Sequence, residues 1–231
     1  MNFRENMNAV LCAGLVFGMG ASVAFADGDD HEEEHFDIGV WSKNGVLRTG
    51  GWDHDEEILA VSSLRVFEAH FGEDPAFPFS IDEPGVGGVA ADLGLPEGAT
   101  LTMRMAAGLG VWNGDGFSAA ATDLTIDYGP LSVNSNTGGD LDFLVTDDFD
   151  LHPIFSINDT SANGSYLLEF TAVMDGFTSS DPFWIVFNLG MDDEDFEGTV
   201  EWVESNLVPA PGALGLLAVS GFASIRRRRR A

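Results

Sequence analysis

Cysteine is almost absent from this 231-residue chain. The single cysteine, Cys12, lies in the first apolar stretch, so the region that follows holds neither a disulfide nor a thiol nucleophile. Lipidation of Cys12 is not expected, because Leu11 precedes it and the apolar run continues beyond it. The body of the chain must therefore fold without covalent cross-links.

Basic residues are also scarce: ten Lys and Arg face 38 Asp and Glu. Six of the ten lie at the two ends of the chain, which leaves a net charge of about −33 between them. The four basic residues of the middle are Lys43, Arg48, Arg65 and Arg104. This field repels phosphate backbones and argues against nucleic acid as a partner. It attracts divalent cations and basic partners, and it also suits a hydrated surface that keeps an exported protein soluble.

Catalytic sequence patterns are scarce as well. HExxH occurs once, as HEEEH at residues 31–35 within an acidic, non-periodic stretch rather than on a predicted helix, and no G-x-S-x-G serine turn or P-loop occurs in the chain. Carboxylate pairs of the glycosidase type carry no information here, because with so many acidic residues some pair falls at a suitable separation by chance. We therefore expect that the chain is not an enzyme, and we assign no catalytic residue. A secreted hydrolase is the third function considered, after the two that are described below.

The first 26 residues have the pattern of a secretory signal peptide. A short basic start precedes the apolar stretch 9–18 (AVLCAGLVFG). Ala24 and Ala26 fit the small-x-small cleavage pattern, and the chain turns polar directly after them. We expect cleavage after Ala26, which leaves residues 27–35 (DGDDHEEEH) as an acidic flexible lead.

The C-terminal segment 207–231 combines three features in a fixed order. A proline motif at 208–212 comes first, the uncharged stretch 212–225 follows, and an arginine cluster at 226–230 ends the series. The residues of the motif and cluster are Val208, Pro209, Ala210, Pro211, Arg226, Arg227, Arg228, Arg229 and Arg230. A helix over 212–225 is roughly 21 Å long, and the preceding uncharged residues extend it toward the roughly 30 Å of a hydrocarbon core. We predict a transmembrane helix there, with the arginines cytoplasmic and residues 27 to about 207 outside.

This order of features resembles the PEP-CTERM sorting signal of Gram-negative exported proteins, with Ala210 at the position where that motif carries Glu. The resemblance implies processing by an exosortase-like enzyme and a link to exopolysaccharide and biofilm production. It places the protein at the cell envelope, outer surface or extracellular matrix of a Gram-negative-type bacterium. Segments 82–85, 166–169 and 182–188 are similar to uncharacterised exported domains with this tail. We expect a surface or matrix component with a structural or binding role.

Between the two ends, residues 36–206 predict one all-β domain. Short apolar runs alternate with Gly, Pro, Asn and Asp clusters, as in an antiparallel β-sandwich or jelly roll. The predicted strands are 36–41, 46–49, 58–67, 101–106, 122–127, 131–133, 141–145, 154–157, 166–173 and 183–189. Asn44-Gly45 predicts a tight hairpin, and residues 192–206 predict a short helix before the transmembrane helix. Residues 72–98, rich in Pro and Gly, predict a long ordered loop.

Histidines and acidic clusters raise the question of metal binding. A transition-metal site would use His35 and His152, whereas calcium would use the acidic loop of Asp147, Asp148 and Asp150. Further oxygen clusters lie at 113–116 and at Asp192, Asp193 and Asp195. None follows the EF-hand spacing, so we expect no cofactor, with a structural Ca²⁺ as the alternative.

Tryptophans bear on sugar binding, because flat rings stack on pyranose faces. Trp184 lies in an apolar run and is predicted to be in the core, whereas Trp52 and Trp112 are predicted to lie in loops. The alternative function is therefore a carbohydrate- or calcium-binding adhesion module. In it, the loops around Trp52, Trp112 and Asp147 would contact an extracellular polysaccharide.

Overall fold

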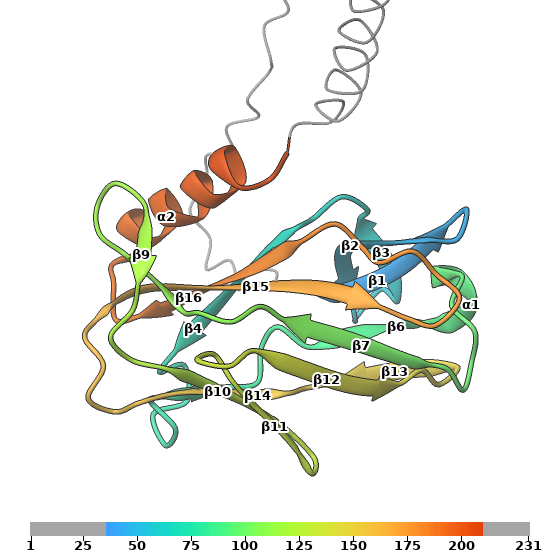
Figure 1. Ribbon diagram of the computed structural model, residues 1–231, viewed down its shortest axis with the longest axis horizontal. Coiled ribbons are helices and arrows are strands. Elements are labelled where there is room, and N and C mark those ends of the chain that lie inside the picture. Colours follow the sequence, from blue (N-terminus) through green and yellow to red (C-terminus); the bar gives the residue numbers. More distant parts are fainter. Residues whose placement is uncertain (1–35, 210–231) are drawn as a thin grey trace, which may run out of the picture. The chain divides into compact units, whose positions relative to one another are not determined.

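The computed structural model describes residues 36–209, and this part of the chain is mostly β-structure, as predicted (Figure 1). Its strands form several sheets whose pairs are almost all antiparallel. The one parallel pair within residues 36–209 joins β16 to β4, two strands that are far apart in sequence. A parallel pair needs a long connection, and here most of the domain supplies it.

The largest sheet has seven strands, with β15 and β16 at its centre. Its main order is β12 (Gly139–Leu144), β7 (Thr100–Met105), β15 (Gly164–Val173), β16 (Phe183–Leu189) and β4 (Val66–Phe71), while β8 (Gly110–Trp112) pairs with β15 and β9 (Phe117–Ala119) pairs with β8. Every residue of β16 is buried. A strand buried on both faces reads as a continuous apolar run, as this one does.

A four-stranded sheet packs against the large one. Its order is β11 (Leu131–Asn134), β10 (Leu124–Tyr128), β14 (Ile154–Ile157) and β5 (Ser80–Ile81). Leu124 and Ile126 are buried and Asp127 is exposed, the alternation expected of a strand with one face toward the core. The ring centroids of Phe155 in β14 and Phe187 in β16 are 5.2 Å apart, so one aromatic core joins the two sheets.

Two smaller sheets complete the β-structure. One consists of β1 (Asp37–Lys43), β2 (Val46–Asp53) and β3 (Ile58–Val61), and the other of β6 (Val86–Val89) and β13 (Asp148–Leu151). Asn44 and Gly45 have φ angles of 56° and 76°, as the tight turn between β1 and β2 requires, so the predicted hairpin is confirmed. The short helix α1 (Ala90–Leu93) follows β6.

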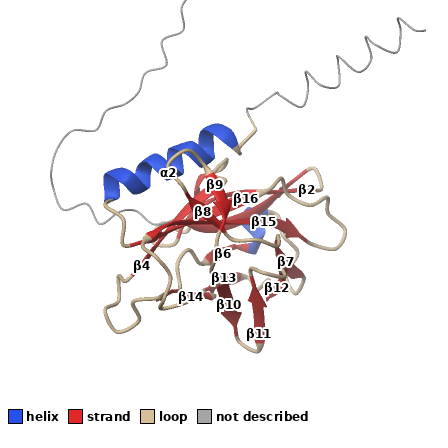
Figure 2. Cartoon of the chain, turned by 60° about the vertical axis from the view of Figure 1, so that its left-hand side comes forward, coloured by secondary structure: helices blue, strands red, loops and turns tan. Residues whose placement is uncertain are grey.

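The helix α2 (Asp193–Asn206) lies across the large sheet, on the side away from β10 and β14 (Figure 2). Phe196, Val200 and Val203 lie at helical spacing on its buried face. They pack with Trp184 and Val186 of β16 in a second apolar cluster. Asp192 is the N-cap residue, and the acidic first turn suits the positive end of the helix dipole.

Two sequence predictions are wrong. The segment 58–67 is not one strand, because a turn at Ser62 and Ser63 sends β3 to β2 and β4 to β16. The segment 72–98 is not all loop, because it contains β5, β6 and α1. The sequence of β6 is Val-Gly-Gly-Val, and its extended state comes from pairing with β13 rather than from the preference of its own residues.

Within residues 36–209, no helix has the length and hydropathy needed to cross a membrane. The predicted signal peptide (1–26), acidic lead (27–35), transmembrane helix (212–225) and arginine cluster (226–230) lie outside the described residues, as do Ala210 and Pro211. Of the proline motif, Val208 packs partly against the α2 cluster and Pro209 is exposed.

Candidate metal centre

The candidate metal centre lies where the start of β1, the start of β6 and the end of β13 meet. Asp37 is the first residue of β1 and pairs with Trp52 of β2. Asp150 lies in β13 opposite Gly87 of β6, and His152 follows just after β13. One ligand atom from each of Asp37, Asp150 and His152 can be chosen so that all three lie within 4.8 Å of one another.

Asp37 is a buried carboxylate held in a close-fitting backbone cradle. It is 6% exposed, and its Oδ1 accepts a hydrogen bond of 2.8 Å from the N–H of Gly85. A Cβ atom on Gly85 would lie 2.6 Å from Oδ1, and one on Gly87 would lie 3.0 Å from Oδ2. Glycine at both positions lets the backbone approach this closely. A carboxylate has room for about four hydrogen bonds, so burial leaves much of its charge uncompensated.

His152 is oriented by contacts on both ring nitrogens. Its Nδ1 is 3.1 Å from the carbonyl oxygen of Asp82 and 3.4 Å from Oε1 of Glu83, while Nε2 is 2.7 Å from Oδ1 of Asp150. The carboxylate of Asp150 can only accept, so without a metal Nε2–H donates to it; with Nδ1–H donating to the carbonyl, a metal ion would take the place of the Nε2 proton. Metal-binding histidines in general are held in this way, with the second ring nitrogen donating to a carbonyl or carboxylate. His54 lies at the edge, with Nε2 3.7 Å from Oδ2 of Asp150.

The electrostatics of the cluster show an excess of negative charge. Burial raises the pKa of Asp37, and the charge of Asp150 adds to this rise while His152 opposes it. Burial also raises the pKa of Glu83, with a further rise from the charge of Asp37. Burial lowers the pKa of His152, but the Asp82 carbonyl and the neighbouring carboxylates outweigh it, so the net shift is upward. All three groups hold protons to a higher pH than usual, and a divalent cation would supply the same positive charge.

The donor set fits a transition metal such as Zn²⁺ better than calcium. One imidazole and two carboxylates are typical zinc ligands, and three protein ligands leave a fourth position for water. Calcium prefers six to eight oxygen ligands and rarely takes an imidazole. Zinc bonds of about 2.1 Å place ligand atoms about 3.4 Å apart, so binding would need only small side-chain movements, including a slight separation of Nε2 of His152 from Oδ1 of Asp150, which are 2.7 Å apart.

The candidates from the sequence enter this centre only in part. Asp150 and His152 belong to it, whereas Asp147 and Asp148 do not, and His35 lies outside the described residues. Asp148 and Asp150 were predicted in a loop and instead lie in β13. Asp37 was missed, since nothing in its local sequence sets it apart and only the fold brings β1 to β13.

The other predicted oxygen clusters have local roles. Asp193 and Asp195 lie in the first turn of α2, and Asp192 is its N-cap residue. Segment 113–116 forms the turn between β8 and β9, where the N–H of Asp115 donates to Oδ1 of Asn113 at 3.1 Å. None of these residues belongs to the metal-type group that residues 36–209 form.

The tryptophans differ from prediction at two of three positions. Trp184 is 4% exposed, which confirms it as a core residue. Trp52 lies in β2 rather than a loop and is only 2% exposed, because it faces the core beside β6. Trp112 lies in β8 and is half-buried, with its ring centroid 5.3 Å from that of Phe117 and 5.7 Å from that of Trp202 in α2. The rings of Trp52 and Trp112 therefore both pack against other residues of the domain.

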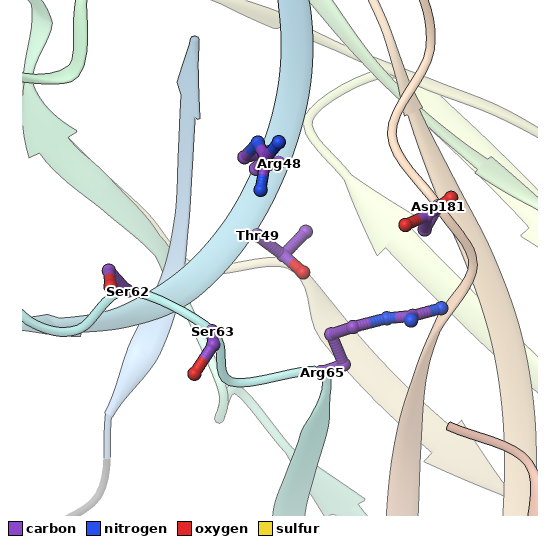
Figure 3. A pocket seen from close by; sticks show the side chains of 6 residues that line it. All are labelled: Arg48, Thr49, Ser62, Ser63, Arg65 and Asp181. Carbon is purple, nitrogen blue, oxygen red and sulfur yellow. The ribbon is translucent and has the colours of Figure 1, made fainter. Parts of the chain in front are cut away.

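A second polar site is a pocket of about 100 Å³ between β2 and the turn that precedes β4 (Figure 3). Its lining residues are Arg48, Thr49, Ser62, Ser63, Arg65 and Asp181. No protein-family model, curated protein or solved structure shows a significant match to the chain.

Proposed function

We propose that this chain is an exported surface or extracellular-matrix protein whose β domain binds one divalent cation through Asp37, Asp150 and His152. The observation that carries the binding role is the buried carboxylate of Asp37, which converges with an aspartate and an oriented histidine. The ion pairs that this cluster makes within residues 36–209 involve histidines alone, and this region holds four basic against 31 acidic side chains. The role we propose is binding, not catalysis.

The export part of the proposal rests on the two ends of the chain. The signal-peptide pattern, the proline motif, the apolar stretch and the five arginines stand in the order that export and PEP-CTERM-type sorting require. The last helix that the structure describes, α2, ends at Asn206, directly ahead of segment 207–231. A membrane helix at 212–225 and an exosortase-like enzyme would then act on a tail that follows a complete domain, and extracellular polysaccharide would surround it.

The fold that we propose is a β-sandwich of the jelly-roll kind. The support is the packing of the four-stranded sheet against the seven-stranded one through Phe155 and Phe187. Loops and short strands at one end of such a sandwich are a common place for a binding site, since the sheets hold them rigid. The cluster of Asp37, Asp150 and His152 likewise lies on short strands and the loop next to them.

Metal binding is tested by calorimetric titration of the purified domain with Zn²⁺, and separately with Ca²⁺. Asp150→Asn should abolish the binding of Zn²⁺, because it removes a charged ligand. Asp148→Asn is the matched control, since Asp148 lies two residues earlier in the same strand, is also exposed and is not part of the cluster. A domain that binds neither ion, or that loses affinity equally in both variants, would show that the cluster is not a metal site.

Export is tested by fractionation of cells that express the full chain and a chain ending at residue 207. The full chain should be found in the membrane or at the surface, and the shortened chain should be released. The mature protein should begin at Asp27. Recovery of the full chain in the cytosol with Met1 intact would contradict the proposal.

A further inference from the structure

The distribution of the few basic side chains singles out one pocket. Residues 36–209 contain four of them, and two, Arg48 and Arg65, line the same pocket of about 100 Å³ (Figure 3). Half of the basic side chains of this region therefore line one pocket, which also holds the carboxylate of Asp181. Charge beyond about 8 Å is largely screened at physiological salt, so the charged side chains that line the pocket contribute most to the field inside it.

Arg48 offers an unpaired guanidinium. It projects from β2, is exposed, and its Cζ is 5.6 Å from the ring centroid of Trp41. In the part of the chain that the structure describes, the side chain of Arg48 makes no hydrogen bond or ion pair. Stacking on an indole ring restrains the plane of the guanidinium while its N–H edge stays free to donate.

Arg65 is fixed more firmly at the opposite side of the pocket. Its Nε donates to the carbonyl oxygen of Pro182 at 2.8 Å, its Nη2 donates to the same oxygen, and its Cζ is 5.4 Å from the ring centroid of Trp184. Burial lowers the pKa of Arg65, while the charge of Asp181 opposes this shift. The group stays a cation, because the usual pKa of arginine lies far above neutrality.

The remaining lining adds hydroxyl donors and one carboxylate. Ser62 and Ser63 form the turn before Arg65 and make no side-chain hydrogen bond among residues 36–209, whereas the hydroxyl of Thr49 donates to the carbonyl of Leu64 at 3.0 Å. Figure 3 shows the Arg65 side chain extended toward Asp181, with Thr49 beside Arg48. Guanidinium groups with nearby serine hydroxyls are the donors that recognise planar or tetrahedral oxyanions.

We propose that this pocket binds a small oxyanion group, a carboxylate or a sulfate, between Arg48 and Arg65. The volume of about 100 Å³ suits one such group rather than a whole sugar ring, so a larger ligand would insert its charged group and keep its body outside. Asp181 opposes the anion, which keeps the affinity modest. The site is separate in chemistry and in residues from the cluster of Asp37, Asp150 and His152, and it goes beyond the proposed cation binding.

The test is an NMR or calorimetric titration of the folded domain at low ionic strength with sodium sulfate, sodium acetate and a uronic acid trimer. Arg48→Gln should weaken binding about tenfold, as expected for the loss of a charge-assisted hydrogen bond. Asp181→Asn should strengthen binding, because it removes the opposing charge. The control is Arg104→Gln, whose guanidinium is already paired with Asp140 at 2.8 Å and should leave the affinity unchanged.

The three probes also separate the possible sources of the group. Tighter binding of the uronic acid trimer than of acetate means that the group belongs to an acidic saccharide, whereas equal binding of the small ions means that a free oxyanion is the ligand. Either result supports the site. No binding of any probe, or equal losses in Arg48→Gln and Arg104→Gln, would overturn it.

Discussion

Replacing Asp37 with Asn is expected to have opposite effects on the domain with and without metal. The side chain of Asn keeps an Oδ1 acceptor for the N–H of Gly85, so the hydrogen bond that Asp37 makes there is preserved. What is lost is a negative charge that burial and Asp150 both disfavour, as the raised pKa of Asp37 shows. The substitution therefore separates the cost of the charge from the packing of the cradle.

In the absence of metal, Asp37→Asn should raise the free energy of unfolding at neutral pH. Because the pKa of Asp37 is raised in the folded state, the folded domain holds this proton to a higher pH than the unfolded chain does. The contribution of this proton to the free energy of unfolding is fully present below the ordinary Asp pKa and is lost as the pH rises through the raised pKa of the folded domain. Asn has no such proton to lose, so the variant should gain over the wild type as the pH increases from about 4 to 7.

In the presence of metal, the order should reverse. At a free Zn²⁺ concentration of 100 times Kd, binding adds about 2.7 kcal/mol to the stability of the wild type. For a domain of this size about 1 kcal/mol shifts Tm by roughly 2–4 °C, so Zn²⁺ should raise the wild-type Tm by about 5–10 °C. Asp37→Asn lacks a charged ligand and should show almost no shift.

The assay is thermal unfolding of both proteins at pH 5 and pH 7.5, with chelator and with Zn²⁺. Asp148→Asn, in β13 two residues before Asp150 but outside the cluster, should behave as the wild type does in every condition. A variant that is less stable than the wild type in chelator at pH 7.5 would refute the argument that Asp37 carries an uncompensated charge. An unchanged Zn²⁺ shift in the variant would refute its role as a ligand.

Three further predictions concern pH, helix α2 and the aromatic cluster. The affinity for Zn²⁺ should fall about tenfold per pH unit below the raised pKa of His152, because the proton and the metal compete for Nε2. If calorimetric titrations between pH 8 and 5.5 gave the same affinity throughout, His152 would not be a ligand. Gly198→Ala should stabilise the domain by about 0.5–1 kcal/mol in urea unfolding, because Gly198 lies inside α2 and a Cβ atom there meets nothing within 4 Å. A loss of stability would contradict the open space that the structure shows beside Gly198. Trp112→Ala should lower stability by about 2 kcal/mol through lost contacts with Phe117 and Trp202; unchanged stability together with lost glycan binding would instead favour the adhesion module.

Elements with strong local signals were predictable from the sequence. The strands Ile154–Ile157 and Phe183–Leu189 have the predicted boundaries, and α2 begins within one residue of its predicted start. The turn at Asn44-Gly45 was predictable for the same reason, since both residues favour positive φ. In each case the residues that specify the element lie inside it.

Elements that depend on distant partners were not predictable. Gly87 and Gly88 in β6 would weaken a strand considered alone, and β6 exists because β13 supplies its hydrogen-bond partners. The candidate site has the same character, because Asp37 meets Asp150 and His152 only through the contact of β1 with β6 and of β6 with β13. The sequence singled out Asp150 and His152 separately, Asp150 as part of an acidic cluster for calcium and His152 as a histidine ligand for a transition metal, and only the structure places them in one site.

Both candidate sites follow from one property of this domain, the shortage of its own cations. A carboxylate that folding buries, such as Asp37, can be neutralised by a proton, by a side-chain cation or by an ion from solution. Among residues 36–209, the cationic groups beside the clustered carboxylates are His152 and His54, so a proton or a metal ion is the remaining source of positive charge there. Arg48 and Arg65, in contrast, lie away from this cluster and share a pocket with a single carboxylate, Asp181. If those arginines existed only to stabilise the fold, pairing with the abundant acidic side chains would be the expected arrangement, and Arg48 would not be left with its N–H edge free.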